Sequence, residues 1–318
     1  CFTNHFLTGS TLTLIKNVEN PDGVLGTTYL DEEDWTLTAT PSPSGTAISG
    51  VTGDEDITNA VVDPGSWTLS EAAGTGADAA SAAAYAGTWA CTATGEGADP
   101  TLGTGNVLTV TEGRDYTCTV TNKTAELSVL KMVEGELQVG DFTVSAQAQG
   151  GADPAVSPEL AAALPKLEAT GDVEPSTSNS ILVLPGADYE VTEAAAAGKP
   201  LYLQKALEKY TPGVTPPAGS EACPSVTSST PNWTAVWSDA TYAHCWVPVS
   251  GATPTNPARV SVAAGDSDVY RFVNVAPVAP TLPLTGGASS FMYFVLGLSL
   301  VGAAVGAEMI RRKKRGSG

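Results

Sequence analysis

The sequence is poor in the residues that most catalytic and metal sites require. It has two histidines, His5 and His244, in 318 residues, and its five cysteines include no CxxC pair. Zinc sites and Ser–His–Asp or Cys–His pairs depend on these residue types, so a zinc protein and a nucleophilic hydrolase are both disfavoured. Glycine-rich stretches such as GTGADAA (74–80) do not follow a strand and open a helix, as a dinucleotide site requires. We therefore expect no turnover enzyme, no cofactor and no metal.

Basic residues are also few, since 15 Lys and Arg stand against 34 Asp and Glu, for a formal net charge of −19. Five of these cations are consecutive, at Arg311–Arg315, which leaves the preceding chain more acidic still. So acidic a surface repels the phosphates of nucleic acids and of anionic lipids, and we expect no nucleic-acid partner. The acid runs Asp31–Asp34 and Gly53–Asp56 lack EF-hand spacing, so solvated surface charge is favoured over calcium binding.

Long helical patterns are scarce before residue 290, whereas Gly, Pro, Thr and Ser are abundant and Trp, Tyr and Val recur in short runs. This combination favours an all-β class with loop insertions, and the length allows two ordinary domains. Five cysteines without metal-type spacing fit two disulfides and one remaining thiol, which implies an oxidising compartment.

Three short patterns occur twice in the chain, in the same order, which indicates two tandem repeats. Successive side chains of a strand point to opposite faces, so residues of one strand whose numbers are all odd or all even share a face. This parity shows which polar residues lie on the same face as the apolar ones. In each repeat one Lys, one Glu and one Asn fall on the apolar, core-facing rows: Lys16, Glu71 and Asn122, then Lys131, Glu193 and Asn274. The paired patterns are TLTLIKNVE (11–19) and ELSVLKMVE (126–134), PGSWTLSEAA (64–73) and PGADYEVTEAA (185–195), and DYTCTVTN (115–122) and DVYRFVN (268–274).

A Lys, a Glu and an Asn buried together form a reactive set. Burial lowers the pKa of an amine and raises that of a carboxylic acid by up to about 3–5 units, which favours the neutral forms of both. The neutral amine can attack the Asn side-chain carbonyl, while the protonated acid hydrogen-bonds the oxygen and carries a proton to departing ammonia. The product is a Lys–Asn isopeptide bond, formed once per domain and without a cofactor, because proximity contributes about 7–11 kcal/mol. The alternative is a partly buried Lys–Glu salt bridge beside a hydrogen-bonded Asn.

The Lys strand, the G-x-aromatic-x-Φ-x-E strand (Φ apolar) and the final Φ-x-N strand resemble the collagen-adhesin B-type, or SpaA-like prealbumin-fold, domains of Gram-positive surface proteins. The resemblance covers roughly residues 7–277 and implies tandem immunoglobulin-like (prealbumin-like) β-sandwiches. In that family, Lys on the first strand is joined to Asn or Asp on the last, assisted by an acid between them. The resemblance thus implies a Lys16–Asn122 bond assisted by Glu71 and a Lys131–Asn274 bond assisted by Glu193.

These features divide the chain into six parts. Residues 1–6 are interpreted as the end of a preceding, truncated repeat, since Asn4 matches a last-strand Asn, and the partner of Cys1 is expected upstream. The other parts are repeat 1 (7–124), repeat 2 with an insertion (125–277), a Pro-rich linker with a sorting motif (278–290), a transmembrane helix (291–310) and a basic cytoplasmic tail (311–318).

The cysteines are expected to pair within the repeats. Cys91 follows Trp89 on one strand face and Cys118 lies on the core face, which favours a Cys91–Cys118 disulfide. Cys223–Cys245 is then the second disulfide, because the other pairings would cross between domains.

Repeat 2 carries an insertion of about residues 195–265. Within it, Leu201–Tyr210 has apolar residues at nearly helical spacing, and before it Pro158–Ala169 predicts a short helical turn or two. The insertion also has an aromatic group that fits either a core or a platform for sugar rings. Its members are Trp233, Trp237, Tyr242 and Trp246.

The C-terminal tail is apolar and then basic. Phe291–Ile310 is mostly apolar and about 30 Å long as a helix, which matches a bilayer core, and Arg311–Arg315 favours the cytoplasmic side. Alone, this pattern describes a membrane-anchored protein. However, Leu282, Pro283, Leu284, Thr285 and Gly286 fit the LPxTG sorting signal of Gram-positive wall proteins. The resemblance implies that a sortase cleaves after Thr285 and joins its carboxyl to peptidoglycan.

Together these features predict the stalk of a sortase-anchored surface adhesin or pilus-associated protein, in the cell wall on the extracellular surface of a Gram-positive bacterium. Its expected partners are sortase and peptidoglycan, with the membrane only before sorting. The alternative is a ligand-binding module that uses the 195–265 insertion to recognise a glycan or a host protein.

Overall fold

The computed structural model of the chain describes residues 9–21, 29–95, 97–134, 138–150, 156–199, 202–225, 240–249 and 257–276. All of them belong to one compact unit, Cys1–Pro277, which is separate from Val278–Gly318. Residues 1–6, the predicted sorting motif, the predicted transmembrane helix and the basic tail lie outside the described residues. In the part of the chain that is described, no helix is long and apolar enough to cross a bilayer.

Repeat 1 is a sandwich of two four-stranded sheets around one apolar core. Its elements are β1 (Ser10–Glu19), the 3-10 turn η1 (Glu32–Asp34), β2 (Trp35–Ser42), β3 (Ile48–Gly50), η2 (Glu55–Ile57), β4 (Ala60–Val62), β5 (Gly65–Ala73), α1 (Ala79–Ala83), β6 (Ala86–Ala93), β7 (Val107–Val110) and β8 (Asp115–Lys123). One sheet has the order β4-β1-β8-β6 and the other β3-β2-β5-β7. Buried residues alternate with less buried ones along β1, because successive side chains of a strand point to opposite faces.

Repeat 2 is a sandwich of a five-stranded and a four-stranded sheet. Its elements are β9 (Ala125–Glu134), η3 (Val139–Asp141), β10 (Phe142–Ala148), α2 (Pro158–Ala163), β11 (Leu167–Thr170), β12 (Ser180–Val183), β13 (Tyr189–Ala195), β14 (Leu203–Tyr210), η4 (Ala240–Cys245), β15 (Trp246–Pro248), β16 (Ala258–Val260) and β17 (Ser267–Val275). The sheet orders are β12-β9-β17-β14-β15 and β11-β10-β13-β16.

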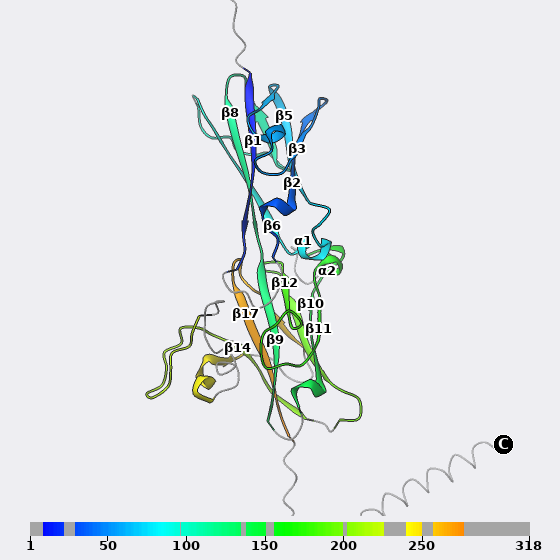
Figure 1. Ribbon diagram of the computed structural model, residues 1–318, viewed down its shortest axis with the longest axis vertical. Helices are drawn as coiled ribbons and strands as arrows, with labels where there is room; N and C mark the ends of the chain where they lie inside the picture. Colours follow the sequence, from blue (N-terminus) through cyan, green and yellow to red (C-terminus); the bar gives the residue numbers. More distant parts are fainter. Residues whose placement is uncertain are drawn as a thin grey trace, which may run out of the picture. The chain divides into compact units, whose positions relative to one another are not determined.

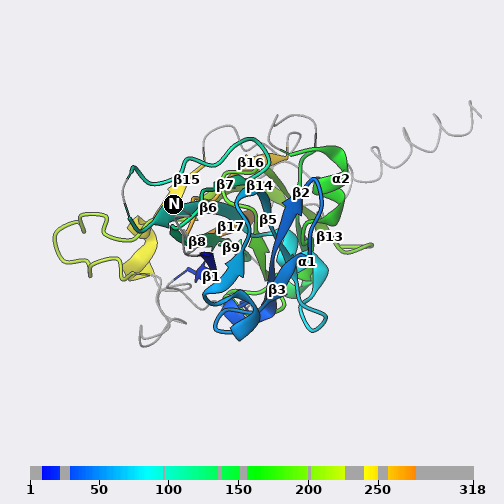
Figure 2. The same cartoon turned by 90° about the horizontal axis from the view of Figure 1, so that it is seen from above.

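The two sandwiches have the same strand order. When strands are matched by their neighbours in the sheets, β1 to β8 of repeat 1 correspond in order to β9, β10, β11, β12, β13, β14, β16 and β17 of repeat 2. Among the described strands, β15 alone has no counterpart in repeat 1. In each repeat the first strand runs parallel to the last over nine residue pairs, β1 beside β8 and β9 beside β17 (Figure 1). Seen from above, β2, β3 and β5 form a layer apart from β1 and β8 (Figure 2). The all-β expectation is confirmed for the described residues.

The helical interpretation of Leu201–Tyr210 is wrong, because β14 occupies this segment and pairs with both β17 and β15. Two residues of β14 are buried, Leu207 in the main core and Tyr210 in a smaller cluster on the other face of the sheet, whereas Leu203 is 58% exposed. Buried residues three positions apart on opposite faces break the period-two alternation, which made the spacing look helical. The short helix expected within Pro158–Ala169 is present as α2.

The insertion of repeat 2 is also shorter than the predicted 195–265. Strands β14 and β16 hold the places that β6 and β7 hold in repeat 1, so the additional chain is confined to residues 211–257.

A single residue, Thr124, separates β8 from β9. It is fully buried, and its hydroxyl donates a hydrogen bond to the Ala84 carbonyl at 3.1 Å. Next to it, the Tyr29 hydroxyl donates to the Glu126 carboxylate of β9 at 2.9 Å. The last strand of repeat 1 therefore continues into the first strand of repeat 2 without a linker.

Candidate functional sites in the two cores

In repeat 1, an amine, a carboxylate and a carboxamide lie in the core between the two sheets. Lys16 on β1 is 1% exposed, and its Nζ forms an ion pair with Glu71 on β5 of the opposite sheet. Lys16 is opposite Val120 in the parallel ladder, so Asn122, two residues further along β8, is its diagonal neighbour on the same face. Asn122 is fully buried. The structure thus brings together the three residues selected by parity.

Repeat 2 has the same arrangement at the corresponding strand positions. Lys131 Nζ on β9 lies 2.7 Å from Glu193 Oε2 on β13, and it also donates to the Phe272 carbonyl at 3.4 Å. Lys131 is opposite Phe272 in the parallel ladder, and Asn274 lies two residues further along β17. The diagonal offset from Lys to Asn is therefore identical in the two repeats.

Burial changes the protonation of both lysine amines. It lowers the pKa of Lys131 from 10.5 to about 8, although the charge and hydrogen bond of Glu193 act in the opposite direction. Burial likewise lowers the pKa of Lys16, against the hydrogen bond and charge of Glu71. Each core therefore increases the fraction of neutral, nucleophilic amine.

The carboxamides lack the partners that a structural Asn would have. Both side-chain polar atoms of Asn122, Nδ2 and Oδ1, are buried without a hydrogen-bond partner, and so is Asn274 Oδ1. A buried polar group left unpaired costs about 1–3 kcal/mol. The salt-bridge alternative requires a hydrogen-bonded Asn, and neither the Asn122 side chain nor the Asn274 Oδ1 atom has such a partner.

An aromatic ring that the polar sequence motifs did not predict covers each amine. The ring centroid of Trp35, the first residue of β2, lies 4.1 Å from Lys16 Nζ, and that of Phe142, the first residue of β10, lies 4.3 Å from Lys131 Nζ. Both rings are buried and help to keep water from the amines. A signal was available, because both rings follow Asp in matching runs, DWTLTA (34–39) and DFTVSA (141–146).

Among the other ion pairs, the one between Lys209 and Asp268 is partly buried but lacks the dry surroundings of the two core sites. Lys209 Nζ lies 2.5 Å from Asp268 Oδ2, and burial raises the pKa of the Asp268 carboxyl. However, 37% of the Lys209 side chain is exposed, so water reaches and solvates the amine. We therefore distinguish this surface ion pair from the two core sites.

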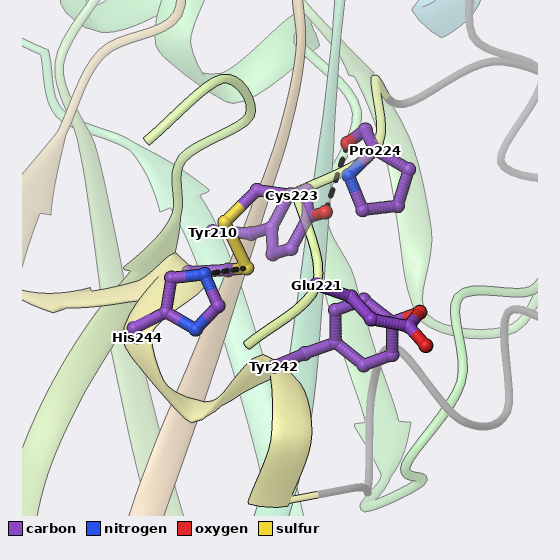
Figure 3. Close-up of a disulfide and its surroundings, with 7 residues drawn as sticks. Tyr210, Glu221, Cys223, Pro224, Tyr242 and His244 are labelled. Carbon is purple, nitrogen blue, oxygen red and sulfur yellow. Dashed lines mark hydrogen bonds between the residues drawn. A yellow bond between two sulfur atoms is a disulfide. The ribbon is translucent and has the colours of Figure 1, made fainter. Parts of the chain in front are cut away.

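The structure contains both predicted disulfides, Cys91–Cys118 and Cys223–Cys245. The first joins two residues that lie directly opposite each other on β6 and β8. The second joins the chain that follows β14 to the end of η4, and so ties the insertion together (Figure 3).

His244 lies beside the second disulfide, with Nε2 3.7 Å from Cys245 Sγ (Figure 3). With Cys223 and Cys245 it forms the one group of potential metal ligands found within the described ranges. Both sulfur atoms are used in the disulfide, so the group offers no thiolate to a metal.

The aromatic group of the insertion is described only in part, because Trp233 and Trp237 lie outside the described residues. Trp246 is 4% exposed, with its ring 3.9 Å from Arg271 Cζ and 5.4 Å from the Tyr210 ring. This ring is therefore core and is not available as a platform for sugars.

The two sandwiches, each with parallel first and last strands, define a tandem all-β repeat protein. Residues 8–120 match the SpaA_2 family, described as a prealbumin-like fold domain, so repeat 1 has a SpaA-like, prealbumin-like fold. Repeat 2 lies outside this match but has the same strand order. A search of curated proteins gave no match.

Several solved structures are similar at low identity. The major pilin T-13 of Streptococcus pyogenes is 14% identical with a TM-score of 0.30, over 85% of this chain and 98% of that chain. The pilus adhesin SpaC of Lactobacillus rhamnosus GG, in its open conformation, is 11% identical with a TM-score of 0.28, over 86% of this chain and 32% of that chain. Another major pilin of S. pyogenes is 12% identical with a TM-score of 0.26, over 83% of this chain and 97% of that chain. At these TM-scores the likenesses carry no weight for fold or function.

Proposed function

We propose that each core forms an intramolecular isopeptide bond, Lys16 to Asn122 and Lys131 to Asn274. One observation carries the proposal: a buried amine paired with a carboxylate recurs at the same diagonal offset from a buried Asn in both repeats. The unpaired polar atoms of the two Asn side chains support it further.

The reaction needs only the three side chains of each site. The neutral Lys Nζ attacks Cγ of the Asn, the new C–N bond forms, and the bond from Cγ to Nδ2 breaks. Glu71 or Glu193 accepts the proton that the amine loses and delivers it to Nδ2, which leaves as ammonia. Each site reacts once, so the chain consumes no substrate and releases only ammonia.

We further propose that the two crosslinked repeats form the stalk of a surface adhesin or pilus-associated protein. A sortase would join Thr285 to peptidoglycan, and the chain would contact the membrane only before that step. The support is the sequence itself: the run Leu282–Gly286, the apolar stretch 291–310 and the five following cations. A wall-anchored chain that carries load gains from covalent bonds that reducing agents do not break.

Intact-mass analysis of the full chain under reducing conditions tests the crosslinks. Two Lys–Asn bonds expel two ammonia molecules, so the folded chain should weigh about 34 Da less than its sequence dictates. Glu71→Ala and Glu193→Ala should each restore about 17 Da, since each removes one proton carrier. A bond between Lys209 and Asp268 would instead expel water, about 18 Da. A wild-type chain at its full sequence mass would falsify the proposal.

Anchoring has a separate test in a Gram-positive host that expresses a sortase. The wild-type chain should be released from cells by a muramidase that digests peptidoglycan. The Thr285→Ala variant should stay in the membrane fraction, because its tail is not exchanged for the wall. Equal release of both variants would contradict the sortase step and leave the crosslinks untouched.

A further inference from the structure

Gly87 lies at the point where the reacting groups of repeat 1 meet. It is directly opposite Asn122 in the antiparallel pairing of β6 with β8, so a side chain here would point to the same face as the carboxamide. A Cβ atom at this position would lie 2.5 Å from Glu71 Oε1 and 2.6 Å from Asn122 Oδ1. Non-bonded carbon contacts are optimal at about 3.5–4.0 Å, so any side chain would displace both groups.

The backbone itself does not call for glycine at this position. Gly87 is not among the residues with positive φ, so an L-residue could adopt its conformation without strain. The third nearest atom to its Cβ position, Val120 Cγ2 at 3.5 Å, is at an ordinary contact distance. The crowding therefore comes only from the carboxyl of Glu71 and the carboxamide of Asn122.

We propose that Gly87 is a positioning residue for the repeat 1 crosslink, an inference that rests on the proposed function. Its missing side chain leaves the space in which the Glu71 carboxyl and the Asn122 carboxamide lie close together. In that space the bond from Lys16 Nζ to Asn122 Cγ forms, the bond from Cγ to Nδ2 breaks, and Glu71 transfers the proton to the departing ammonia.

An alanine at this position should disturb the reaction more than the fold. The two atoms it would displace are the ends of side chains, which can rotate away without moving the backbone. The reaction does not tolerate such a shift, because a displacement of about 1 Å from the reactive geometry can cost roughly a hundredfold in rate. Gly87→Ala is therefore expected to fold and to crosslink about a hundredfold more slowly in repeat 1.

Repeat 2 has a different arrangement at the corresponding position and so supplies an internal control. Gln204 on β14 is the residue opposite Asn274, and the pairing register shifts between Gln204 and Ala206. A bulge at this point changes the direction of the neighbouring side chains, so the position opposite Asn274 does not need to be glycine. Gly87→Ala should leave the repeat 2 crosslink unchanged.

The experiment follows the mass of the full chain over time. Wild-type, Gly87→Ala and Gly76→Ala chains are kept in denaturant from synthesis, refolded, and sampled for intact mass and crosslinked peptides. Gly76 is the matched control, because a Cβ there meets no atom within 4 Å and its φ is not positive. Wild type and Gly76→Ala should lose about 34 Da, whereas Gly87→Ala should first lose about 17 Da, assigned to repeat 2.

The outcomes separate this inference from the proposed function. If Gly87→Ala crosslinks repeat 1 at the wild-type rate, the inference is overturned and the crosslinks stand. If wild type loses no ammonia, both are overturned. A comparison of thermal midpoints tests folding: measured before its repeat 1 bond has formed, Gly87→Ala should match Asn122→Ala, which cannot form that bond. A midpoint well below that of Asn122→Ala would show that Gly87 serves the fold, which also overturns the inference.

Discussion

A lysine amine inside a protein must lose its proton before it can attack an amide, so pH should control the rate of crosslinking. Burial lowers the pKa of Lys131 to about 8, so below pH 8 each unit of acidification reduces the neutral fraction about tenfold. We expect the rate of ammonia loss from repeat 2 to rise with pH and to level off above about pH 8. The measurement is intact mass against time for chains refolded from denaturant between pH 6 and 10. A rate that still rises tenfold per unit between pH 9 and 10 would contradict the lowered pKa.

The aromatic residue above each lysine can be tested by exchange between the repeats. Repeat 2 uses Phe142 where repeat 1 uses Trp35, so Trp35→Phe should keep the repeat 1 crosslink. Trp35→Gln places a polar group and water near the Lys16 amine, which favours its protonated form. We expect this variant to lose most of the repeat 1 crosslink, measured by peptide mapping, with repeat 2 unchanged. Equal crosslinking in both variants would show that the ring has no part in the reaction.

Parity along single strands was enough to select all six polar residues of the two sites. A strand pattern states which face a residue occupies, and Lys16, Glu71 and Asn122 all share a face with buried apolar residues. It does not state which residue of the other sheet lies across the core. The contacts of Trp35 and Gly87 lie between strands, so the folded structure shows what they touch, although the matching runs DWTLTA and DFTVSA could have pointed to Trp35.

At the scale of elements, alternation identified a strand with one buried face and failed for a strand with single buried residues on both faces. β1 alternates and was predicted correctly, whereas β14 buries Leu207 in the core and Tyr210 in the cluster on the other face, three positions apart. Several residues that pack in the cluster with Tyr210 belong to the insertion, which follows β14 in the sequence. The local sequence pattern of β14 does not show that the insertion folds back onto this strand. The boundary of the insertion was misjudged for the same reason.

The insertion also makes a prediction at this scale. Cys223→Ser with Cys245→Ser removes the bond that ties it together, so residues 211–257 should become sensitive to limited proteolysis. The repeat 2 crosslink should persist, because β14 still pairs with β17 over the segment next to Asn274. The matched control is Cys91→Ser with Cys118→Ser, where β6 and β8 remain paired along their length. Loss of the repeat 2 crosslink on removal of Cys223–Cys245 would mean that the insertion supports the core site.

At the scale of the whole molecule, strand order determines where tension travels. The first and last strands of each repeat are parallel neighbours, so pulling on the two ends of a repeat shears the ladder between them. With the proposed crosslinks, a Lys16–Asn122 bond would cross that ladder, and Thr124 would pass the load directly from β8 to β9. A Lys131–Asn274 bond would then carry the load to β17. Nearly all of the chain between each pair of bonded residues would be bypassed.

Single-molecule stretching under reducing conditions, in which the two disulfides do not shorten the released chain, measures this directly. On the order of 100 residues lie between the bonded residues of each repeat, and at about 3.5 Å each they would release roughly 350 Å or more on unfolding. A crosslinked repeat cannot release that length, so the wild-type chain should show no unfolding step of this size up to forces that break covalent attachments. Asn122→Ala should restore one such step and the double variant with Asn274→Ala two, because only the hydrogen-bonded ladders then resist. Full-length steps in the wild-type chain would show that both repeats rely on their ladders alone.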